Sequence, residues 1–223
     1  MKRIPEPELM NNNEQAAAYA EADFSEPHNR VISLFNETFG LDRINGYVLD
    51  LGCGPGDITF RFARAYPDCT VHGIDGAEAM IRCGLKLLRK SADIKHRVEL
   101  IHGLLPAAVP PRMKYDTVIS NSLLHHLIDP LVLWQTIKRY AAPDAPIFIV
   151  DLKRPTSPEE AHRLVETYSG GEPEILKNDF YNSLLAAFTT SEIKAQLLKV
   201  NLDYLDVTEI GDRHLQISGH FQR

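Results

Sequence analysis

The decisive stretch of this chain is residues 48–57, which read Val48-Leu49-Asp50-Leu51-Gly52-Cys53-Gly54-Pro55-Gly56-Asp57. The apolar run 46–51 suits a buried strand, because large and β-branched side chains stand between turn-forming residues. The glycines that follow allow positive φ angles and a close approach of the backbone to a ligand. In the next segment, apolar residues at 58, 62 and 65 recur with nearly helical spacing. A strand, a glycine turn and a helix make the first half of a nucleotide-binding unit.

The spacing of the glycines argues against a dinucleotide site. Such a site uses G-x-G-x-x-G, whereas Gly52, Gly54 and Gly56 give G-x-G-x-G. Asp50 precedes the loop, where an acid suits an amino group or a positive centre better than a phosphate. The pattern resembles motif I of the class I S-adenosylmethionine-dependent methyltransferases, written E/D-x-G-x-G-x-G. The resemblance implies that Asp50, the three glycines and Cys53 bind S-adenosyl-L-methionine; the alternative is a glycine turn without a ligand.

A second acid follows the next predicted strand, residues 69–74. Asp75 lies about 20 residues past the glycine loop, where an α/β nucleotide site places its ribose-binding acid. Its carboxylate could accept hydrogen bonds from both ribose hydroxyls, cap a helix, or do both. The resemblance extends to the segment D-x-S-x-x-M, which Asp75 and Met80 match while Ala77 replaces the usual serine. It implies that Gly76 also contacts the cofactor and that Met80 packs near adenine.

The composition is that of a soluble globular protein with 223 residues, of which 44% are hydrophobic and 24% charged. A net charge of −6 argues against broad nucleic-acid binding. No apolar stretch reaches the roughly 18 residues of a membrane span, and the N-terminus lacks the apolar core of a signal peptide. The three cysteines form no CxxC pair, which fits a reducing compartment. We therefore expect a cytoplasmic protein with no nucleic-acid or membrane partner; the oligomeric state stays open.

The order of predicted elements indicates an α/β fold. Helices over 8–23 and 27–39 would make residues 1–45 an N-terminal helical cap, followed by a Rossmann-like domain over 46–223. Alternating strands and helices predict a mostly parallel sheet that is covered on both faces. The predicted strands are 46–51, 69–74, 97–102, 115–120 and 145–151, and the helices between them are 56–66, 77–91 and 130–141.

The end of the chain changes this pattern. A helix over 190–200 precedes two predicted strands, 204–210 and 214–220, whose short connection requires an antiparallel pair. We therefore expect the sheet to end with a strand that runs against the others. This resembles the seven-stranded methyltransferase sheet, which is doubly wound, mostly parallel and antiparallel at its last strand. Residues 155–189 form a long insertion, and long excursions near a site often act as lids.

Further cofactor contacts are expected after the third and fourth strands, because ligands bind at the carboxyl ends of such sheets. Gly103 and Leu104 are the candidates for adenine binding, although many relatives have an acid where Leu104 stands. Without that acid, a backbone group reads adenine or recognition is looser. Residues 120–127 resemble the S-N-x-x-x-H-H-L segment of many small-molecule methyltransferases. This implies that the backbone of Ser120 and Asn121 lies at the amino-acid end of the cofactor.

The two histidines of that segment are the main catalytic candidates. A neutral imidazole near the transferred methyl group could take a proton from a hydroxyl, amine or thiol, and His125 is the favoured base. Alternatively, His125 or His126 packs against the sheet. Adjacent histidines could also ligate a metal, but no third ligand appears at diagnostic spacing, so no metal site is predicted. Asp151, after the fifth strand, either faces the substrate or acts as a capping or salt-bridged acid. Tyr19, on the first predicted helix, is a further catalytic candidate.

The favoured function is methyl transfer from S-adenosylmethionine to an O, N, S or C atom of a small-molecule acceptor. Direct displacement at the sulfonium methyl group requires mainly alignment of the acceptor atom with the S–CH3 bond. Two alternatives remain: another sulfonium-using transferase, or a non-catalytic regulatory protein that binds the cofactor. An aminopropyl transferase would need further acids near the fourth strand, and residues 120–122 supply none.

Overall fold

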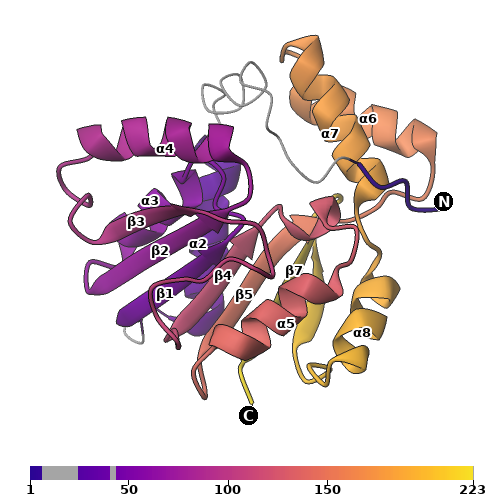
Figure 1. Cartoon of the computed structure of the whole chain (residues 1–223). Helices are drawn as coiled ribbons and strands as arrows, with labels where there is room; N and C mark the ends of the chain where they lie inside the picture. Colours follow the sequence, from indigo (N-terminus) through magenta and orange to yellow (C-terminus); the bar gives the residue numbers. More distant parts are fainter. Residues whose placement is uncertain (7–24, 41–43, 223) are drawn as a thin grey trace.

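The computed structural model describes residues 1–6, 25–40 and 44–222. Seven strands form one sheet in the order β3-β2-β1-β4-β5-β7-β6 (Figure 1). Strands β1 to β5 pair in parallel, whereas β7 is antiparallel to both of its neighbours. The strands are β1 (Gly46–Leu51), β2 (Cys69–Asp75), β3 (Val98–His102), β4 (Thr117–Asn121), β5 (Pro146–Leu152), β6 (Asp206–Ile210) and β7 (His214–His220).

Helices cover both faces of the sheet, as the alternating pattern predicts. They are α2 (Ser25–Phe39), α3 (Asp57–Ala65), α4 (Glu78–Lys90), α5 (Leu131–Tyr140), α6 (Pro158–Ser169), α7 (Glu174–Ala186) and α8 (Thr190–Lys199), with the short 3-10 helix η1 (Leu124–His126) after β4. None of the described helices is long and apolar enough to cross a membrane.

Two buried apolar clusters hold these layers together. On one face, α2, α3 and α4 pack against the sheet, and Phe35 stacks edge-on against Phe62 and Phe148. On the other face, α5 and α8 pack around the fully buried Trp134, whose indole N–H donates to Gln196 at 2.9 Å. Strand β5 is buried along its whole length, and its sequence is apolar except for Asp151. The core therefore fixes the carboxyl ends of β1, β2, β4 and β5 side by side.

The predicted strands are confirmed to within two residues at each end. The fourth strand begins at Thr117 rather than residue 115, because Tyr115 forms only an isolated bridge with Ala141. The last strand of the chain is antiparallel, as predicted, but it does not lie at the edge of the sheet. Strand β7 pairs with β5 over seven residues, from Pro146↔His220 to Leu152↔His214, and the hairpin then places the more exposed β6 outermost. The edge strand therefore runs parallel to β5.

The insertion before α8 contains two helices, α6 and α7. Helix α6 begins with Ser157 as its N-cap, whose side chain accepts from Glu160 N at 3.2 Å, and with Pro158 in the first turn. Helices α6 and α7 pack together through Leu164 and Leu184 above the sheet (Figure 1). The predicted helix 27–39 is present as α2, while residues 8–23 lie outside the described residues.

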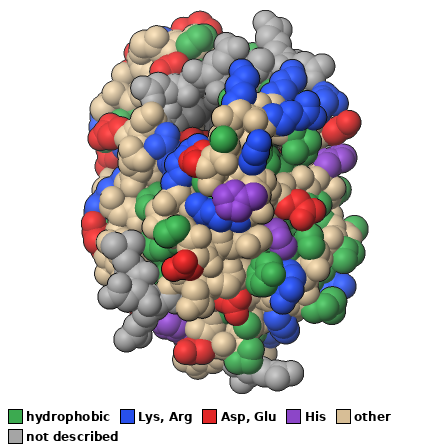
Figure 2. Space-filling view, turned by 90° about the vertical axis from the view of Figure 1, so that its left-hand side faces the viewer, with side chains coloured by type: hydrophobic (Ala, Val, Ile, Leu, Met, Phe, Trp, Pro, Cys, Tyr) green, Lys and Arg blue, Asp and Glu red, His purple; other side chains and the backbone are tan. Residues whose placement is uncertain are grey.

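The face shown in Figure 2 carries charges of both signs. Lysine, arginine, aspartate and glutamate side chains lie between neutral ones across this side of the molecule.

Candidate functional site

A cavity of about 1020 Å³ opens at the carboxyl ends of the parallel strands. The glycine loop after β1 lines one end, and η1 with α7 lines the other. Pockets of roughly 300–1,000 Å³ hold drug-sized ligands. The cavity therefore has room for a nucleoside cofactor together with a small acceptor.

The glycine loop shows a different physical requirement at each glycine. All three glycines have positive φ, at 75°, 54° and 90° for Gly52, Gly54 and Gly56. A Cβ atom on Gly52 would collide with Leu123, and one on Gly56 would collide with Phe60. A Cβ on Gly54 would meet no atom within 4 Å, because it would project into the cavity. Gly56 is not among the cavity-lining residues that the structure describes, so its role there is to start α3.

Asp75 joins the glycine loop to the start of α4. Its Oδ2 accepts from Gly54 N at 2.8 Å and its Oδ1 accepts from Ala77 N at 2.7 Å. Burial raises the pKa of this carboxyl, although both backbone bonds favour the charged form. Asp75 lines the cavity, and each carboxylate oxygen has a further lone pair that a hydroxyl could use. Ala77 is the N-cap of α4 and no described side chain caps that helix, so Asp75 holds the turn before the helix, a role that is compatible with ribose binding.

Asp50 is buried at the end of β1 and lines the same end of the cavity. The hydroxyl of Thr59 donates to its Oδ2 at 2.6 Å. Burial raises the pKa of Asp50 to about 7, and the nearby Asp75 raises it further against the effect of Thr59. No basic side chain in the described part of the chain forms an ion pair with Asp50. A cationic ligand group at this position would stabilise its charged form.

Most other residues predicted to bind the cofactor line the cavity. Met80 is buried in its wall, and Leu104 is half exposed. Ser120 is an exception, because its hydroxyl donates to Leu51 O at 2.7 Å between two strands and does not face the described cavity. Ser122, with a φ of 56°, lines the cavity instead. The predicted residues on the cavity surface are Asp50, Gly52, Cys53, Gly54, Asp75, Gly76, Met80, Gly103, Leu104 and Asn121.

The opposite end of the cavity is built around His125 in η1. Its Nδ1 lies 2.6 Å from Oδ1 of Asp151. The same oxygen accepts from Leu152 N at 2.8 Å, and Oδ2 of Asp151 accepts from Leu124 N at 2.7 Å. Burial by itself would lower the pKa of His125, but the Asp151 carboxylate outweighs burial and raises it. The pKa of Asp151 is lowered in turn, against its own burial, by His125 and the Leu124 N–H. Asp151 thus orients His125 from the next strand.

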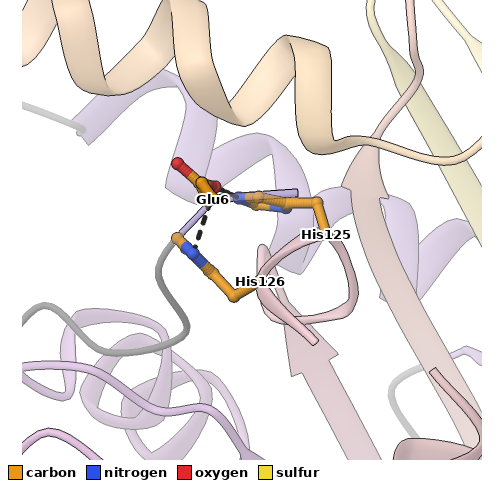
Figure 3. Close-up of side chains that lie close together, drawn as sticks. All are labelled: Glu6, His125 and His126. Carbon is orange, nitrogen blue, oxygen red and sulfur yellow. Dashed lines mark ion pairs between the residues drawn. The ribbon is translucent and has the colours of Figure 1, made fainter. Parts of the chain in front are cut away.

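Glu6 completes this group from the N-terminal segment (Figure 3). Its Oε1 lies 3.1 Å from Nδ1 of His126 and 3.7 Å from Nε2 of His125. The hydroxyl of Ser183, on α7, donates to the same oxygen at 3.0 Å. The sequence gives no signal for Glu6, because it lies in a short charged segment far from every motif.

Arg3 holds the N-terminal segment, residues 1–6, against the site. Its Nε donates to Ala186 O at 2.5 Å, and its Nη2 donates to His125 O at 2.8 Å and Leu127 O at 2.9 Å. The guanidinium also lies 4.0 Å from the centre of the Phe188 ring. The segment lies beside α7 in Figure 1. These contacts place Glu6 beside the two histidines.

The remaining wall of the cavity comes from α6, α7 and the β6–β7 turn. Arg213 lies over the ring of Tyr168, with 3.2 Å between its Cζ and the ring centre, and lines the cavity. Burial lowers the pKa of the adjacent His214 to about 4, so this imidazole is neutral near pH 7. Phe180 of α7 also faces the cavity. Tyr19, predicted from the sequence as a catalytic candidate, lies outside the described residues.

Comparison with known proteins supports a methyltransferase family. Residues 49–147 match the family model described as a methyltransferase domain. A trans-aconitate 2-methyltransferase of Variovorax paradoxus is 31% identical over 127 residues, 56% of this chain and 45% of that protein. An uncharacterized methyltransferase of Schizosaccharomyces pombe is 29% identical over 100 residues, 43% of this chain and 36% of that protein. The chain therefore spans half or less of the length of these relatives.

Solved structures show that the likeness extends over the whole fold. A plantazolicin methyltransferase in complex with a desmethyl analogue and SAH has a TM-score of 0.69 at 16% identity, covering 94% of this chain and 91% of its own. A SAM-dependent methyltransferase of Aquifex aeolicus has a TM-score of 0.67 at 19% identity, covering 94% and 98%. Residues 49–147 thus match the methyltransferase domain, and the chain as a whole has the fold of these S-adenosylmethionine-dependent methyltransferases.

Proposed function

We propose that this protein transfers a methyl group from S-adenosylmethionine to a small-molecule acceptor bound against His125 and His126. One observation carries the proposal: a single cavity joins the glycine loop and its two acids to the histidine group. The class of enzyme indicates the donor, and the arrangement of side chains indicates where donor and acceptor meet.

The residues at the glycine-loop end fit the cofactor. The open space at Gly54 lets a ligand reach the backbone, and the positive φ of this residue favours glycine over residues with a side chain. Asp75 offers oxygens to ribose hydroxyls while its backbone bonds hold it in place. Asp50, which lacks a described cationic partner, suits the amino group or the positive charge of the donor. We expect Met80 and Leu104 to provide the apolar surface for adenine.

Methyl transfer requires mainly that the protein align the acceptor atom with the S–CH3 bond. Bound S-adenosylmethionine supplies the methyl group. The acceptor atom forms a bond to the methyl carbon while the S–CH3 bond breaks and its electrons stay with sulfur. Holding the two reactants in line contributes several kcal/mol of the barrier reduction, about 7–11 kcal/mol in the most favourable cases. Because Asp151 occupies Nδ1 of His125, the other ring nitrogen is the one directed toward Glu6 and the acceptor. A hydroxyl, thiol or amine acceptor would lose its proton at this position.

The rest of the cavity wall determines which acceptor fits. We propose that the insertion 155–189 acts as a lid whose aromatic residues Tyr168 and Phe180 contact the acceptor. The nearby Arg213 and the neutral His214 add polar groups to this wall. The relatives named trans-aconitate 2-methyltransferase support a small organic acceptor rather than a macromolecule.

Calorimetry and a transfer assay test the proposal together. The full-length protein should bind S-adenosylmethionine with one site per chain, and it should move labelled methyl groups from the donor to a component of a metabolite extract below about 1 kDa. Binding without transfer to any fraction would favour a non-catalytic cofactor-binding protein. Absence of binding would contradict the proposal.

A further inference from the structure

We infer that Glu6, His125 and His126 bind a divalent transition-metal cation of the zinc class at the acceptor end of the cavity. This inference rests on the proposed function, because the cation would hold the acceptor in line with the methyl group. The three ligand atoms all lie within 4.8 Å of one another. Figure 3 shows both imidazole rings turned toward the same carboxylate.

The two separations between Glu6 and the imidazole nitrogens are close to those of a tetrahedral zinc site. Zinc binds histidine nitrogen and carboxylate oxygen at about 2.0–2.2 Å, so neighbouring ligand atoms lie about 3.3–3.6 Å apart. Glu6 Oε1 lies 3.1 Å from His126 Nδ1 and 3.7 Å from His125 Nε2. These two distances lie just below and just above the tetrahedral range, so small side-chain movements would bring both ligand pairs into that range. Two histidines and one glutamate with an open fourth position are also a known catalytic ligand set for zinc.

An unsatisfied nitrogen points to a ligand at this position. Nδ1 of His126 is buried and makes no hydrogen bond among the described residues, although Glu6 Oε1 is only 3.1 Å away. The angles at Nδ1 and Oε1 therefore do not suit a hydrogen bond between these two atoms. A buried polar atom without a partner is costly and rare. A cation between Nδ1 and Oε1 would satisfy both lone pairs at once.

The surroundings of the three residues are those of a prepared metal site. Asp151 lies 2.6 Å from Nδ1 of His125, which leaves Nε2 as the free ring nitrogen. A ligating histidine almost always donates its other N–H to a carboxylate or carbonyl in this way. Two backbone N–H groups hold Asp151, and Ser183 holds Glu6. The two carboxylates also balance the charge of a divalent cation.

The open fourth position would receive the acceptor. His125 and His126 both line the cavity, so an acceptor in the cavity would have access to a cation held by them. A coordinated hydroxyl or thiol has a lowered pKa and loses its proton to solvent water more readily. The acceptor atom then keeps the electron pair that forms the bond to the methyl carbon. His125 acts here as a metal ligand and does not itself take the proton.

Zinc binding to the chelator-treated full-length protein tests the inference. Titration calorimetry should show one Zn²⁺ per chain, and Co²⁺ should give the visible absorption of a four-coordinate site. Glu6→Gln and His126→Ala should each weaken Zn²⁺ binding by at least about 100-fold. Asp151→Asn should weaken it by about 10–100-fold. His96→Ala removes an exposed histidine outside the cavity and should leave the affinity unchanged.

Two results would overturn the inference. One is a protein that binds no Zn²⁺, or that binds it equally well as wild type and as Glu6→Gln, with circular dichroism confirming the fold of the variant. The other is methyl transfer at full rate with the chelator present, which would leave His125 as the group that takes the proton. Calorimetry with S-adenosylmethionine on the metal-free protein reports on the proposed function separately, because the donor contacts lie at the other end of the cavity.

Discussion

Nδ1 of His125 lies 2.6 Å from Oδ1 of Asp151, and both side chains are buried where the neighbouring strands β4 and β5 end. The contact fixes the ring orientation and leaves Nε2 as the ring nitrogen directed toward Glu6. It depends on parallel pairing of β4 and β5, which brings the residues that follow both strands to the same edge of the sheet. The position of His125 beside Asp151 therefore depends on the pairing of β4 with β5.

Replacing His125 tests the importance of this geometry for transfer. His125→Ala should lower turnover by roughly 10²–10⁴-fold, because it removes the imidazole against which the acceptor is proposed to bind. The affinity for S-adenosylmethionine should stay nearly unchanged, since the proposed donor contacts lie at the other end of the cavity. A labelled-methyl assay and calorimetry measure the two quantities. The exposed His96→Ala serves as control, and full activity of His125→Ala would leave alignment as the main source of rate.

The glycine loop predicts a matched pair of variants. Gly54 and Gly40 both have positive φ, at 54° and 80°, and a Cβ on either would meet no atom within 4 Å, yet only Gly54 lines the cavity. Asparagine tolerates this backbone region better than other side chains. Gly54→Asn should therefore fold normally and lose at least about tenfold in cofactor affinity, whereas Gly40→Asn should lose none. Equal affinities for the two variants in calorimetry would show that the cofactor does not approach Gly54.

Asp75 has a structural role and a proposed binding role, which a second acid helps to separate. Asp75→Ala should cost roughly 2–4 kcal/mol of cofactor affinity, because ribose hydroxyls would lose charged acceptors. It should also lower the melting temperature, because Gly54 N and Ala77 N lose their partner. Asp116 likewise accepts a backbone N–H, from Tyr47 at 2.7 Å, but lies outside the cavity. Asp116→Ala should lower stability without changing affinity; unchanged affinity in Asp75→Ala would leave Asp75 with its structural role alone.

The buried acid Asp50 predicts opposite pH effects on stability and on cofactor binding. Burial raises its pKa in the folded state to about 7, from an ordinary value of 3.8. The folded state therefore binds this proton more tightly, and the associated stability is lost as the pH rises from about 4 to about 7. The free energy of unfolding of Asp50→Asn, measured by denaturant titration, should rise relative to wild type over this window.

Cofactor affinity should move the other way with pH. A cationic donor favours the ionised form of Asp50, so the affinity of wild type for S-adenosylmethionine should increase as the pH rises toward 7. The increase should be smaller in Asp50→Asn, which cannot ionise. Parallel pH profiles for the two proteins in calorimetry would show that Asp50 does not sense the donor charge.

Glu6 is the residue beside His125 and His126 that short-range sequence patterns could not predict. The adjacent histidines suggested proton transfer or metal binding, but a third ligand at diagnostic spacing was missing from their neighbourhood. The structure supplies Glu6 from the N-terminal segment, which Arg3 fixes to the backbone of η1 and α7. A single glutamate and a single arginine in a charged segment carry no local signal. Their role depends on a contact between distant parts of the chain.

The sequence by itself determined the sheet, the glycine loop and the two acids at the carboxyl ends of β1 and β2. Local rules suffice there, because apolar runs form strands, glycine permits positive φ, and residues that directly follow parallel strands share one edge of the sheet. Only the tertiary structure decided the position of β7 inside the sheet, because its pairing with β5 is a contact between distant parts of the chain. It also decided the grouping of Glu6, His125, His126 and Asp151. That grouping comes from packing between segments far apart in the chain, and neither periodicity nor motif spacing encodes such contacts.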